Sequence, residues 1–291
     1  MSTTAEAPLK SKDYKSDVRV VWCAGCGDYS VLNSVQKAFA ALQLSQENTV
    51  CVSGIGCSSR LPYFMKTYGF HSLHGRALPV ATGIKLANPE LEVVVFGGDG
   101  DGFSIGGGHV PHVVRKNTDI SYILMDNHIY GLTKGQVSPT SGTGFVATTT
   151  PYGSPDPASV NPLSYVLTYG ATFVAQAYSG NPKQVAALIE QAIRHKGFSY
   201  VNILSPCLTF NKVDTFDFYK DAMEQLPEDH DSSNLVQALD KAINPPEGKV
   251  YAGLFYQSER PTLVENLKAI NKKVGADKNM DLNKIVDGFK L

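Results

Sequence analysis

The sequence lacks a long hydrophobic run, an excess of charge of either sign, and an even number of cysteines. No apolar run approaches the roughly 20 residues of a membrane-spanning helix. The 26 basic and 27 acidic side chains leave a net charge of -1, so the basic field typical of nucleic-acid-binding proteins is absent. Residues 1–17 are polar and contain no apolar core of a signal peptide, so we expect a cytoplasmic protein.

The number of cysteines, five, is odd, and Cys23 and Cys26 lie close together. In a cytosolic chain, two closely spaced cysteines such as Cys23 and Cys26 favour metal binding or redox chemistry. The 291 residues, 43% of them hydrophobic, are enough for one large domain, alone or with a small appendage. The sequence contains no internal repeats.

The glycine-rich stretch from Gly97 to Leu132 is the most informative part of the chain. An apolar run at residues 93–96 stops at the sequence GGDGD, and a helical stretch leads to a second apolar run at 120–125. This order predicts a strand, a glycine turn, a helix and a second strand. One such crossover places the two strands in parallel, with their carboxyl ends side by side. We therefore predict an α/β fold with a mostly parallel sheet flanked by helices.

Two polar residues follow these strands directly, Asp99 after the first and Asn127 after the second. Their side-chain oxygens, with the backbone carbonyl of Ile129, are the hard ligands that a divalent cation prefers. The glycine turn allows close approach of a diphosphate, and a helix beginning near Phe103 offers it unpaired N–H groups. A glycine-aspartate turn alone is common and usually only reverses the chain. Its pairing with an asparagine one crossover later is the more specific signal.

Two cysteines also follow predicted strands. The strand Thr49–Ser53 runs into a glycine loop containing Cys57, and a strand at 200–204 ends just before Cys207. Carboxyl ends of parallel strands share one edge of a sheet, so we expect both cysteines near Asp99 and Asn127.

The remaining cysteines have several possible roles. Cys23 and Cys26 in the sequence WCAGCGD can be a redox pair, half of a zinc site or two ligands of an iron–sulfur cluster. Asp28 is expected to cap a helix at 29–44. Cys51 lies inside a strand and is expected to be a small buried hydrophobic residue.

Two basic residues are further candidates. His74 precedes a helix at 77–87 and can contact a phosphate or cap the helix. Lys134 lies in the long Gly, Ser, Thr and Pro-rich loop 131–161, which has the length of a lid or binding loop. Lys134 can hold a carboxylate or phosphate, and a solvated surface lysine is the equally weighted alternative.

Three regions are expected from these patterns. Residues 1–17 are expected to be a flexible arm, and residues 18–210 the cofactor-binding domain. Residues 211–291, with helices at 234–243 and 263–270 and a short apolar run at 250–256, are expected to be a C-terminal extension. This extension is expected to pack on the domain or on a partner subunit.

Five segments together carry a resemblance to a known family. They read WCAGCGDYSVL, GIGCSSRLPYF, HSLHGRALPVATGIKLANP, GGDGDGFSIGG and DNHIYGLTKGQVSPT. In this order the chain resembles the beta subunit of archaeal and bacterial 2-oxoacid:ferredoxin oxidoreductases, over about residues 20–207. One departure is Ala24, where the family often has proline, and this is expected to affect loop rigidity more than ligation.

The resemblance implies a thiamine diphosphate-binding fold and a set of cofactor contacts. The implied thiamine diphosphate contacts are Ile55, Gly56, Cys57, Ser58, His74, Gly100, Asp101, Gly131 and Leu132. It implies Mg²⁺ held by Asp99, Asn127 and the carbonyl of Ile129. It also implies a [4Fe-4S] cluster held by Cys23, Cys26, Cys57 and Cys207, without Cys51.

The implied activity is coenzyme A-dependent oxidative decarboxylation of 2-oxoacids, with electrons passed singly through the cluster to ferredoxin. An alpha subunit is expected to supply the acid that activates the cofactor. The TKGQ sequence resembles members acting on 2-oxoglutarate or on a broad range including pyruvate, with Lys134 contacting a substrate carboxylate or coenzyme A. The alternatives are a nonoxidative thiamine diphosphate decarboxylase or synthase, an indolepyruvate ferredoxin oxidoreductase, and a non-enzymatic electron-transfer or scaffold subunit.

Overall fold

One sheet of eight strands forms the centre of the molecule, in the order β2-β1-β3-β4-β6-β5-β8-β7. The computed structural model describes residues 7–156, 158–275 and 282–289. The strands are β1 Thr49–Ser53, β2 Tyr68–His71, β3 Glu92–Gly98, β4 Ser121–Asp126, β5 Phe173–Tyr178, β6 Ser199–Leu204, β7 Met223–Gln225 and β8 Val250–Gln257.

The first six strands run in the same direction, as the sequence predicts. Strands β1 to β6 pair with one another only in parallel, whereas β8 pairs antiparallel with β5 and parallel with β7. The carboxyl ends of β1, β3, β4 and β6 are consecutive in the sheet. This one edge of the sheet therefore gathers the loops that follow all four strands.

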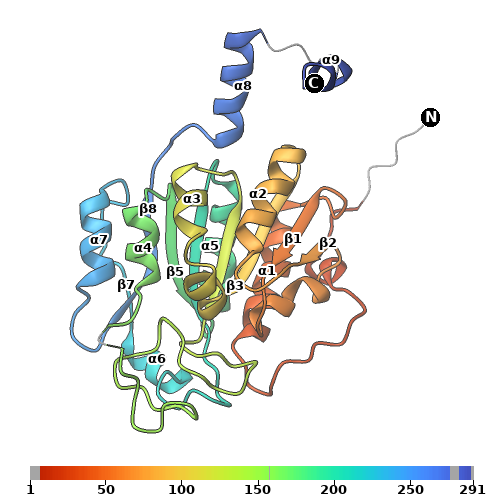
Figure 1. The fold of residues 1–291 in the computed structure, drawn as a ribbon. Helices are drawn as coiled ribbons and strands as arrows, with labels where there is room; N and C mark the ends of the chain where they lie inside the picture. The colour runs from red at the N-terminus through yellow and green to blue at the C-terminus, as the bar shows by residue number, and fades with distance from the viewer. Residues whose placement is uncertain (1–6, 157, 276–281, 290–291) are drawn as a thin grey trace.

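Helices cover both faces of the sheet (Figure 1). Helices α1 (Asp28–Leu42) and α5 (Pro182–Arg194) pack against each other on one face. The other face is covered by α2 (Ala77–Ala87), α3 (Val110–Arg115), α4 (Pro162–Thr168) and α7 (Leu235–Ile243). The short helix α6 (Phe216–Ala222) lies at the end of the sheet where the long loops gather (Figure 1). None of the described helices is long and apolar enough to cross a membrane.

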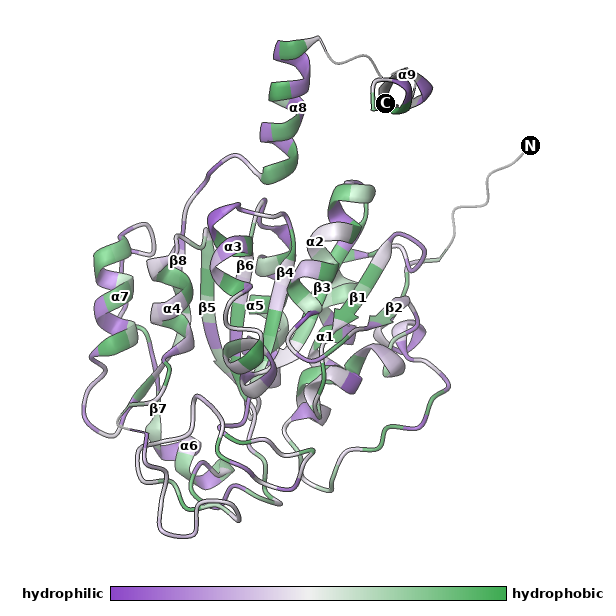
Figure 2. Ribbon diagram, viewed as in Figure 1, coloured by the Kyte–Doolittle hydropathy of each residue, from purple (hydrophilic) through white to green (hydrophobic). Residues whose placement is uncertain are grey.

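Alternating side chains of the strands fill two hydrophobic cores, one on each face. In β3, Val94 and Phe96 face the α1 and α5 side, whereas Val93 and Val95 face the opposite side. Side chains of successive strand residues point to opposite faces, so both faces of a buried parallel strand must be apolar. Each such buried side chain contributes about 1.5–3 kcal/mol relative to exposure. The apolar strands and their polar connections are visible in Figure 2.

The amino-terminal region differs from the expected flexible arm. Residues Ser11–Tyr14 form one turn of 3-10 helix, and Tyr14 is completely buried. Its hydroxyl donates to the carbonyl of Leu44 at 2.6 Å, and its ring packs edge-on against Phe39. This aromatic anchor fixes residues near position 14 to the domain; residues 1–6 of the expected arm lie outside the described residues.

The C-terminal extension contributes directly to the sheet. Strand β8 extends the sheet beyond β5, and β7 forms the far edge. Beyond β8, helix α8 (Leu263–Val274) projects away from the sheet, and a last short helix, α9, spans Leu282–Asp287 (Figure 1). Thus the region from residue 211 does more than pack on an already complete domain, because its strands complete the sheet.

The segment after β3 also differs in detail from expectation. In place of a regular helix from Phe103, one turn of π-helix spans Asp101–Ile105, and the α-helix begins only at Val110. Gly106, at the end of the π-turn, lies against Gly75 so closely that a Cβ on Gly75 would sit 2.5 Å from the Gly106 nitrogen. The wider π-turn accompanies this close contact between two loops of the candidate site.

Candidate cofactor site

The chemistry-bearing residues predicted from the sequence lie at the carboxyl edge of four adjacent strands. Cys57 follows β1, Asp99 follows β3, Asn127 follows β4, and Cys207 follows β6. The parallel pairing of these strands brings together residues that are up to 150 positions apart in the sequence. The expectation of one shared edge is therefore confirmed.

A cavity of about 90 Å³ opens at this edge. Its lining contains all of the residues implied as thiamine diphosphate contacts and all three implied magnesium ligands. The lining residues are Ile55, Gly56, Cys57, Ser58, His74, Gly98, Asp99, Gly100, Asp101, Asn127, Ile129, Tyr130, Gly131, Leu132 and Thr133. Gly98, Tyr130 and Thr133 are additions that the sequence analysis did not single out, although each adjoins a predicted position.

The carboxylate of Asp101 holds together the loops on one side of the cavity. Its Oδ1 accepts hydrogen bonds from the backbone N–H groups of Ile55 at 2.9 Å and Gly75 at 2.7 Å. The same oxygen lies 2.7 Å from Nδ1 of His74. Asp101 is 3% exposed, so its side chain is committed to the loops, and it offers little to a ligand. With Nδ1 engaged, the half-exposed His74 keeps Nε2 as its free ring nitrogen.

Glycine is required where these loops touch. A Cβ on Gly54 would lie 2.0 Å from Oδ2 of Asp101, and one on Gly100 would lie 2.2 Å from the ring of Tyr130. Gly56 has φ +130°, and a Cβ there would meet no atom within 4 Å. Gly54 and Gly100 therefore permit loop packing, whereas Gly56 faces open space beside the cavity and leaves its backbone accessible.

Asp99 lies in an acidic, buried environment. Burial and the neighbouring carboxylate of Asp126 raise the pKa of Asp99 to about 6, although hydrogen bonds from Ser138 and Thr140 and the charge of His128 lower it. Oδ2 of Asp99 accepts a hydrogen bond from the Thr140 hydroxyl at 2.7 Å. A divalent cation at Oδ1 would stabilise the charged carboxylate that burial disfavours.

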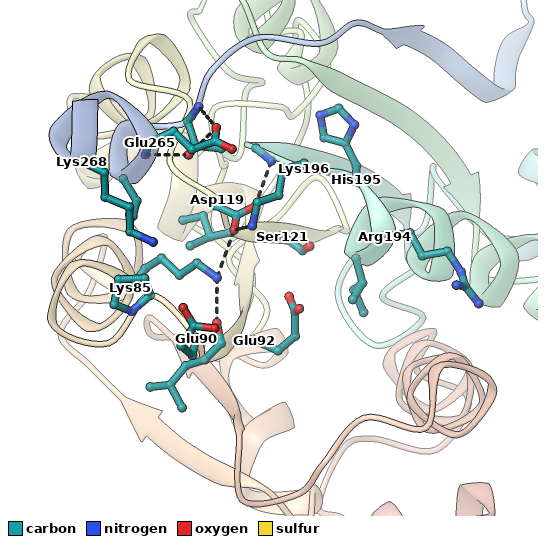
Figure 3. A pocket seen from close by; sticks show the side chains of 17 residues that line it. Lys85, Glu90, Glu92, Asp119, Ser121, Arg194, His195, Lys196, Glu265 and Lys268 are labelled. Atoms are coloured by element: carbon teal, nitrogen blue, oxygen red, sulfur yellow. Dashed lines mark hydrogen bonds and ion pairs between the residues drawn. The ribbon is translucent and has the colours of Figure 1, made fainter. Parts of the chain in front are cut away.

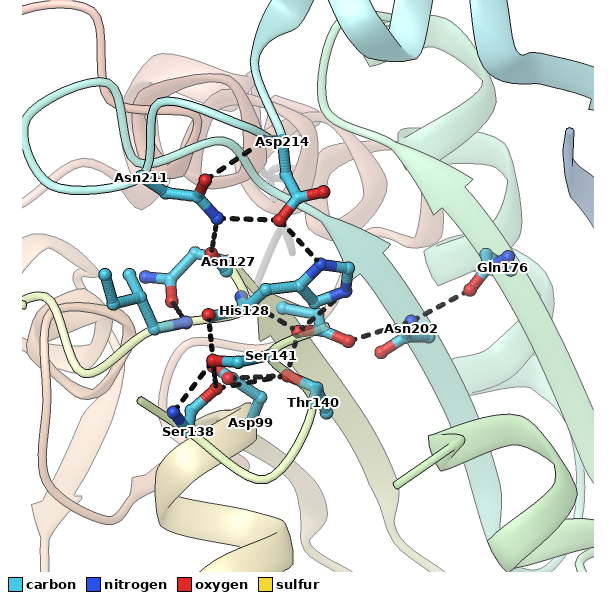
Figure 4. A network of polar contacts seen from close by, with 12 residues as sticks. Asp99, Asn127, His128, Ser138, Thr140, Ser141, Gln176, Asn202, Asn211 and Asp214 are labelled. Atoms are coloured by element: carbon cyan, nitrogen blue, oxygen red, sulfur yellow. Dashed lines mark hydrogen bonds and ion pairs between the residues drawn. The ribbon is translucent and has the colours of Figure 1, made fainter. Parts of the chain in front are cut away.

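Behind the cavity, a polar network connects Asp99 to the partly buried histidine His128 (Figure 4). Nε2 of His128 lies 3.5 Å from Asp126, and Nδ1 lies 3.1 Å from Asp214. Burial lowers the pKa of His128, but the two carboxylates outweigh it and raise this pKa well above 6.5. The resulting imidazolium compensates part of the negative charge around Asp99. The sequence analysis missed this network. The feature that could have indicated it is the pair of titratable residues, Asp126 and His128, on either side of Asn127.

Asn127 is oriented by its own turn. Its Oδ1 accepts the N–H of Ile129 at 3.0 Å, and its carbonyl accepts from Nδ2 of Asn211 at 3.1 Å. A carbonyl oxygen has two lone pairs, so Oδ1 can still accept a second partner. The turn therefore presents the side-chain oxygen of Asn127 with a fixed orientation beside the cavity.

Gly131 marks the point where the cysteines approach this cavity. A Cβ on Gly131 would lie 3.5 Å from Sγ of Cys207, 3.7 Å from Sγ of Cys57 and 3.7 Å from Nδ2 of Asn127. Cys207 and Cys57 thus face the same small region as Asn127. Cys207 and Cys23 are close enough to raise the pKa of Cys57, and Cys207 and Cys57 close enough to raise that of Cys26.

The loop containing Cys23 and Cys26 is fixed to the other cysteine loops by backbone contacts. The N–H of Gly27 donates to the carbonyl of Pro206 at 3.2 Å, and Nε1 of Trp22 donates to the carbonyl of Cys57 at 2.7 Å. Burial, the nearby carboxylate of Asp28 and the other thiols raise the pKa of Cys57 to about 12 and that of Cys26 further. A cationic centre between the thiols would reverse this shift, because thiolates bind metal ions.

Two expectations near the cysteines have different outcomes. Asp28 is the first residue of α1, and Gly27 occupies the capping position. The Asp28 side chain is buried and accepts from the hydroxyl of Ser205 at 2.7 Å, so it connects α1 to the loop before Cys207. Cys51 is completely buried in β1 and accepts a hydrogen bond from Thr67, in agreement with a packing role.

Lys134 directly follows Thr133, which lines the cavity, but it is not itself part of the lining. The side chain is exposed, and its ammonium pairs with no carboxylate in the described part of the chain. Its backbone has φ +78°, in the left-handed region that costs a lysine about 1–2 kcal/mol. This placement agrees with either role predicted for Lys134, a ligand contact or a solvated side chain.

Among the described residues, no group of three or more histidine, cysteine, aspartate or glutamate side chains is arranged to hold one metal ion. The predicted magnesium set contains only one such side chain, Asp99, with an amide and a backbone carbonyl. The predicted cluster ligands would surround four irons rather than one. Magnesium and the iron–sulfur cluster therefore remain predictions.

A second cavity, of about 390 Å³, lies at the opposite, amino edge of the sheet (Figure 3). Asp119 accepts from Lys85 at 3.1 Å and Lys196 at 2.6 Å, and the pairs lie beside Glu92. Burial raises the pKa of Glu92 to about 7. None of the predicted site residues lines this cavity, which places it outside the candidate cofactor site.

Comparisons with known proteins agree with the geometry of the carboxyl edge. The C-terminal TPP binding domain of thiamine pyrophosphate enzymes matches residues 54–203. The C-terminal region of the beta subunits of pyruvate ferredoxin oxidoreductases matches residues 207–272. The fold and the cavity thus define a thiamine pyrophosphate-binding enzyme domain; thiamine pyrophosphate is the same cofactor as thiamine diphosphate.

Individual relatives narrow this class. The KorB subunit of the 2-oxoglutarate oxidoreductase of Mycobacterium tuberculosis is 49% identical over 208 residues, which span 72% of this chain and 56% of that protein. The beta subunit of 2-oxoacid:ferredoxin oxidoreductase 2 of Aeropyrum pernix is 39% identical over 90% of this chain and 80% of its own length. This chain belongs to the family of 2-oxoacid:ferredoxin oxidoreductase beta subunits, and the resemblance seen in the sequence is confirmed.

A solved structure resembles nearly the whole chain. The 2-oxoglutarate:ferredoxin oxidoreductase from Magnetococcus marinus, with 2-oxoglutarate, coenzyme A and succinyl-CoA bound, has a TM-score of 0.93 and 55% sequence identity. The match covers 97% of each chain. The α/β fold with its C-terminal extension is thus the fold of an oxidoreductase subunit.

Proposed function

We propose that this chain, together with an alpha subunit, catalyses coenzyme A-dependent oxidative decarboxylation of 2-oxoglutarate to an acyl-coenzyme A and CO₂, with single electrons passed through a [4Fe-4S] cluster to ferredoxin. The observation that carries this proposal is the surroundings of Gly131, where the thiols of Cys57 and Cys207 and the side chain of Asn127 all lie within 3.7 Å of one point. A nonoxidative enzyme of this fold has no need of four cysteines beside its cofactor. Pyruvate and other 2-oxoacids are further candidate substrates.

The lining of the small cavity fits the diphosphate end of thiamine diphosphate and its cation. His74 has a free Nε2 near the opening, and Gly56 leaves its backbone accessible. Asp99, Asn127 and the carbonyl of Ile129 would hold Mg²⁺, with phosphate oxygens completing its coordination. When bound, thiamine diphosphate supplies the carbanion stabilisation that decarboxylation requires.

Cys23, Cys26, Cys57 and Cys207 fit the ligand set of one [4Fe-4S] cluster. In support, the Sγ atoms of Cys57 and Cys207 lie within 3.7 Å of one point at Gly131, and the loop of Cys23 and Cys26 is hydrogen-bonded to the carbonyls of Cys57 and Pro206. Cys23 is exposed, so a cluster here would lie close to the protein surface on that side. Such a position would allow electrons to leave for a small carrier such as ferredoxin.

The preference for 2-oxoglutarate is supported by Lys134 and by the Magnetococcus marinus enzyme, which is 55% identical and was solved with that substrate. A non-glycine residue held at positive φ in a site loop is a form of strain that often accompanies function. The Lys134 ammonium is free to meet the second carboxylate of 2-oxoglutarate or an acidic group of coenzyme A.

The need for an alpha subunit is supported by the incompleteness of the site. The cavity of about 90 Å³ is well below the roughly 300 Å³ at which ligand sites usually begin. Asp101, the acid nearest to His74, is buried and its Oδ1 has three partners in the loops, so it is unsuited to activating the cofactor. A partner would supply that acid and cover the opening.

The decisive experiment is purification of this chain with its partner from the native cell under anaerobic conditions. Iron, sulfide and thiamine diphosphate would be assayed, followed by coenzyme A-dependent reduction of ferredoxin by 2-oxoglutarate and pyruvate. The proposal expects about four iron and four sulfide per chain, the number in one cubane cluster. Zinc without sulfide, or 2-oxoacid consumption without electron transfer, would indicate a nonoxidative enzyme instead.

A further inference from the structure

The long loop after Gly131 returns to the candidate cofactor site in a way the sequence did not indicate. Its turn Ser138–Ser141 is buried directly behind Asp99 and the β4 end (Figure 4). Ser138, Thr140 and Ser141 are each at most 5% exposed. Small hydroxyl residues in a buried turn need partners, and here the partners are residues of the cofactor site.

Thr140 makes the most direct of these contacts. Its Oγ1 lies 2.7 Å from Oδ2 of Asp99 and 3.0 Å from Oδ1 of Asp126. A threonine hydroxyl carries one proton and donates to one acceptor at a time. The shorter distance favours Asp99, whereas Asp126 has His128 and the amide of Asn202 as further partners.

This donation restrains the carboxylate of Asp99. Its Oδ2 accepts from Thr140, and the Ser138 hydroxyl contributes a further hydrogen bond to the same carboxylate. Asp99 is 2% exposed and lines the cavity, so rotation about its side chain would change which carboxylate oxygen a cation there could reach. The uncharged Thr140 hydroxyl, 2.7 Å from Oδ2, restrains that rotation. It brings no positive charge that would compete with a cation for the carboxylate.

The same turn also fixes the backbone of the second cation-binding segment. The Ser141 hydroxyl donates to the carbonyl of His128 at 2.6 Å and accepts the N–H of Ser138 at 2.9 Å. His128 has φ +56°, a left-handed conformation that reverses the chain between Asn127 and Ile129. The loop therefore contacts both segments that present oxygens to the cavity.

We propose that Thr140 is a positioning residue that orients Asp99 for the divalent cation of the cofactor, through the hydrogen bond from its hydroxyl to Oδ2. This inference rests on the proposed function, because it assumes that Asp99 binds that cation. Groups that orient a metal ligand commonly change metal affinity about 10- to 100-fold when they are removed. Thr140 would touch neither the cation nor the substrate.

The test measures cation binding directly, without turnover. The complete complex with its partner is loaded with thiamine diphosphate and titrated with Mn²⁺, and free Mn²⁺ is followed by electron paramagnetic resonance. Thr140→Val keeps the shape but removes the hydroxyl, and it is expected to weaken Mn²⁺ binding about tenfold or more. Thr140→Ser keeps the hydroxyl and is expected to remain within about threefold of the wild type.

Thr150→Val is the matched control. Thr150 lies in the same loop, but its hydroxyl donates to the carbonyl of Phe145 and is remote from Asp99 in the hydrogen-bond network. This control is expected to bind Mn²⁺ as the wild type does. Equal affinities for the wild type and Thr140→Val would overturn the inference, as would equal losses in the valine and serine variants.

Thr140→Ala is a second variant for the case in which Thr140→Val does not fold or assemble. If Thr140→Val does not assemble, Thr140→Ala removes the hydroxyl without placing a methyl group against the carboxylates and is expected to show the same loss. If neither assembles while Thr140→Ser does, the hydroxyl serves folding and the positioning role is overturned. Failure of the wild-type complex to bind Mn²⁺ at all would overturn the proposed function itself, a result distinct from an unchanged Thr140→Val.

Discussion

Nδ1 of His74 lies 2.7 Å from Oδ1 of Asp101, and this contact fixes the direction in which the free Nε2 of the imidazole points. The same carboxylate oxygen accepts from the N–H groups of Ile55 and Gly75. One buried oxygen thus connects the loop after β1, the loop before α2 and the turn after β3. In this arrangement His74, which is proposed to contact the cofactor, is held in place by Asp101.

Replacing His74 and Asp101 should therefore have different consequences. His74→Ala should weaken thiamine diphosphate binding about tenfold, the loss expected for one hydrogen bond to a charged group, with little change in melting temperature. Asp101→Ala should also lower the free energy of unfolding by about 2–5 kcal/mol, since two buried N–H groups lose their partner. Calorimetric titration of the complex measures the change in thiamine diphosphate binding, and thermal denaturation measures the change in stability. An equal loss of stability in both variants would contradict this division.

Gly54→Ala tests the close contact of the same loops. The added methyl would lie 2.0 Å from Oδ2 of Asp101, and this carboxylate cannot move without breaking the three contacts made by its other oxygen, Oδ1. We expect a loss of about 1–3 kcal/mol in the free energy of unfolding, measured by chemical denaturation. Gly83→Ala in α2 is the control, because its methyl meets no atom within 4 Å and should stabilise the helix by about 1 kcal/mol.

Cys207→Ala tests the proposed cluster. Loss of one of four ligands should reduce the iron and sulfide content and the visible absorbance of the purified complex to a small fraction of the wild-type values. Cys51→Ala is the matched control, since Cys51 is buried in β1 and faces Thr67. It should retain the full iron content. Unchanged iron in Cys207→Ala would exclude this cysteine as a ligand.

Lys134→Gly tests the role of the strained lysine. Glycine adopts φ +78° freely, so the free energy of unfolding should stay the same or rise by up to about 1 kcal/mol. If the ammonium holds the second carboxylate of 2-oxoglutarate, KM for that substrate should rise about tenfold while KM for pyruvate changes little. Lys134→Arg keeps the charge, so its KM for 2-oxoglutarate should lie between those of the wild type and Lys134→Gly. Equal changes for both substrates would contradict substrate recognition by Lys134.

Glu92→Gln tests the buried acid at the opposite edge of the sheet. Burial raises the pKa of Glu92 from 4.5 to about 7, with partial compensation by Lys85. Folding therefore favours the protonated acid, and its contribution to stability falls as pH rises from about 4.5 to about 7. The variant should be more stable than the wild type by about 1–3 kcal/mol at pH 8 and nearly equal at pH 4.5. Thermal denaturation of both proteins from pH 4.5 to pH 8 measures this difference in stability. A difference that does not change with pH would contradict the prediction.

The sequence predicted the local features of the site because each depends on few residues. The helix Ala77–Ala87 and the strand Thr49–Ser53 have the predicted bounds, since period and flanking turn residues define them. The expectations for the N-terminal region and the C-terminal extension differ from the structure because both regions are held by contacts with residues distant in the sequence. Tyr14 is held by Phe39 and Leu44, and β8 is held by β5, neither of which is visible in the local pattern.

The hydrophobic runs of the sequence were enough to predict which residues follow the carboxyl ends of buried strands, and hence that Cys57, Asp99, Asn127 and Cys207 share one edge. That β1, β3, β4 and β6 are consecutive in the sheet, so that this edge is a single site, became visible only in the folded molecule. The same holds for the loop after Gly131, which returns and places Thr140 against Asp99. The physical reason is that strand ends are defined by local hydrophobic runs, whereas strand order and loop return depend on packing between distant segments.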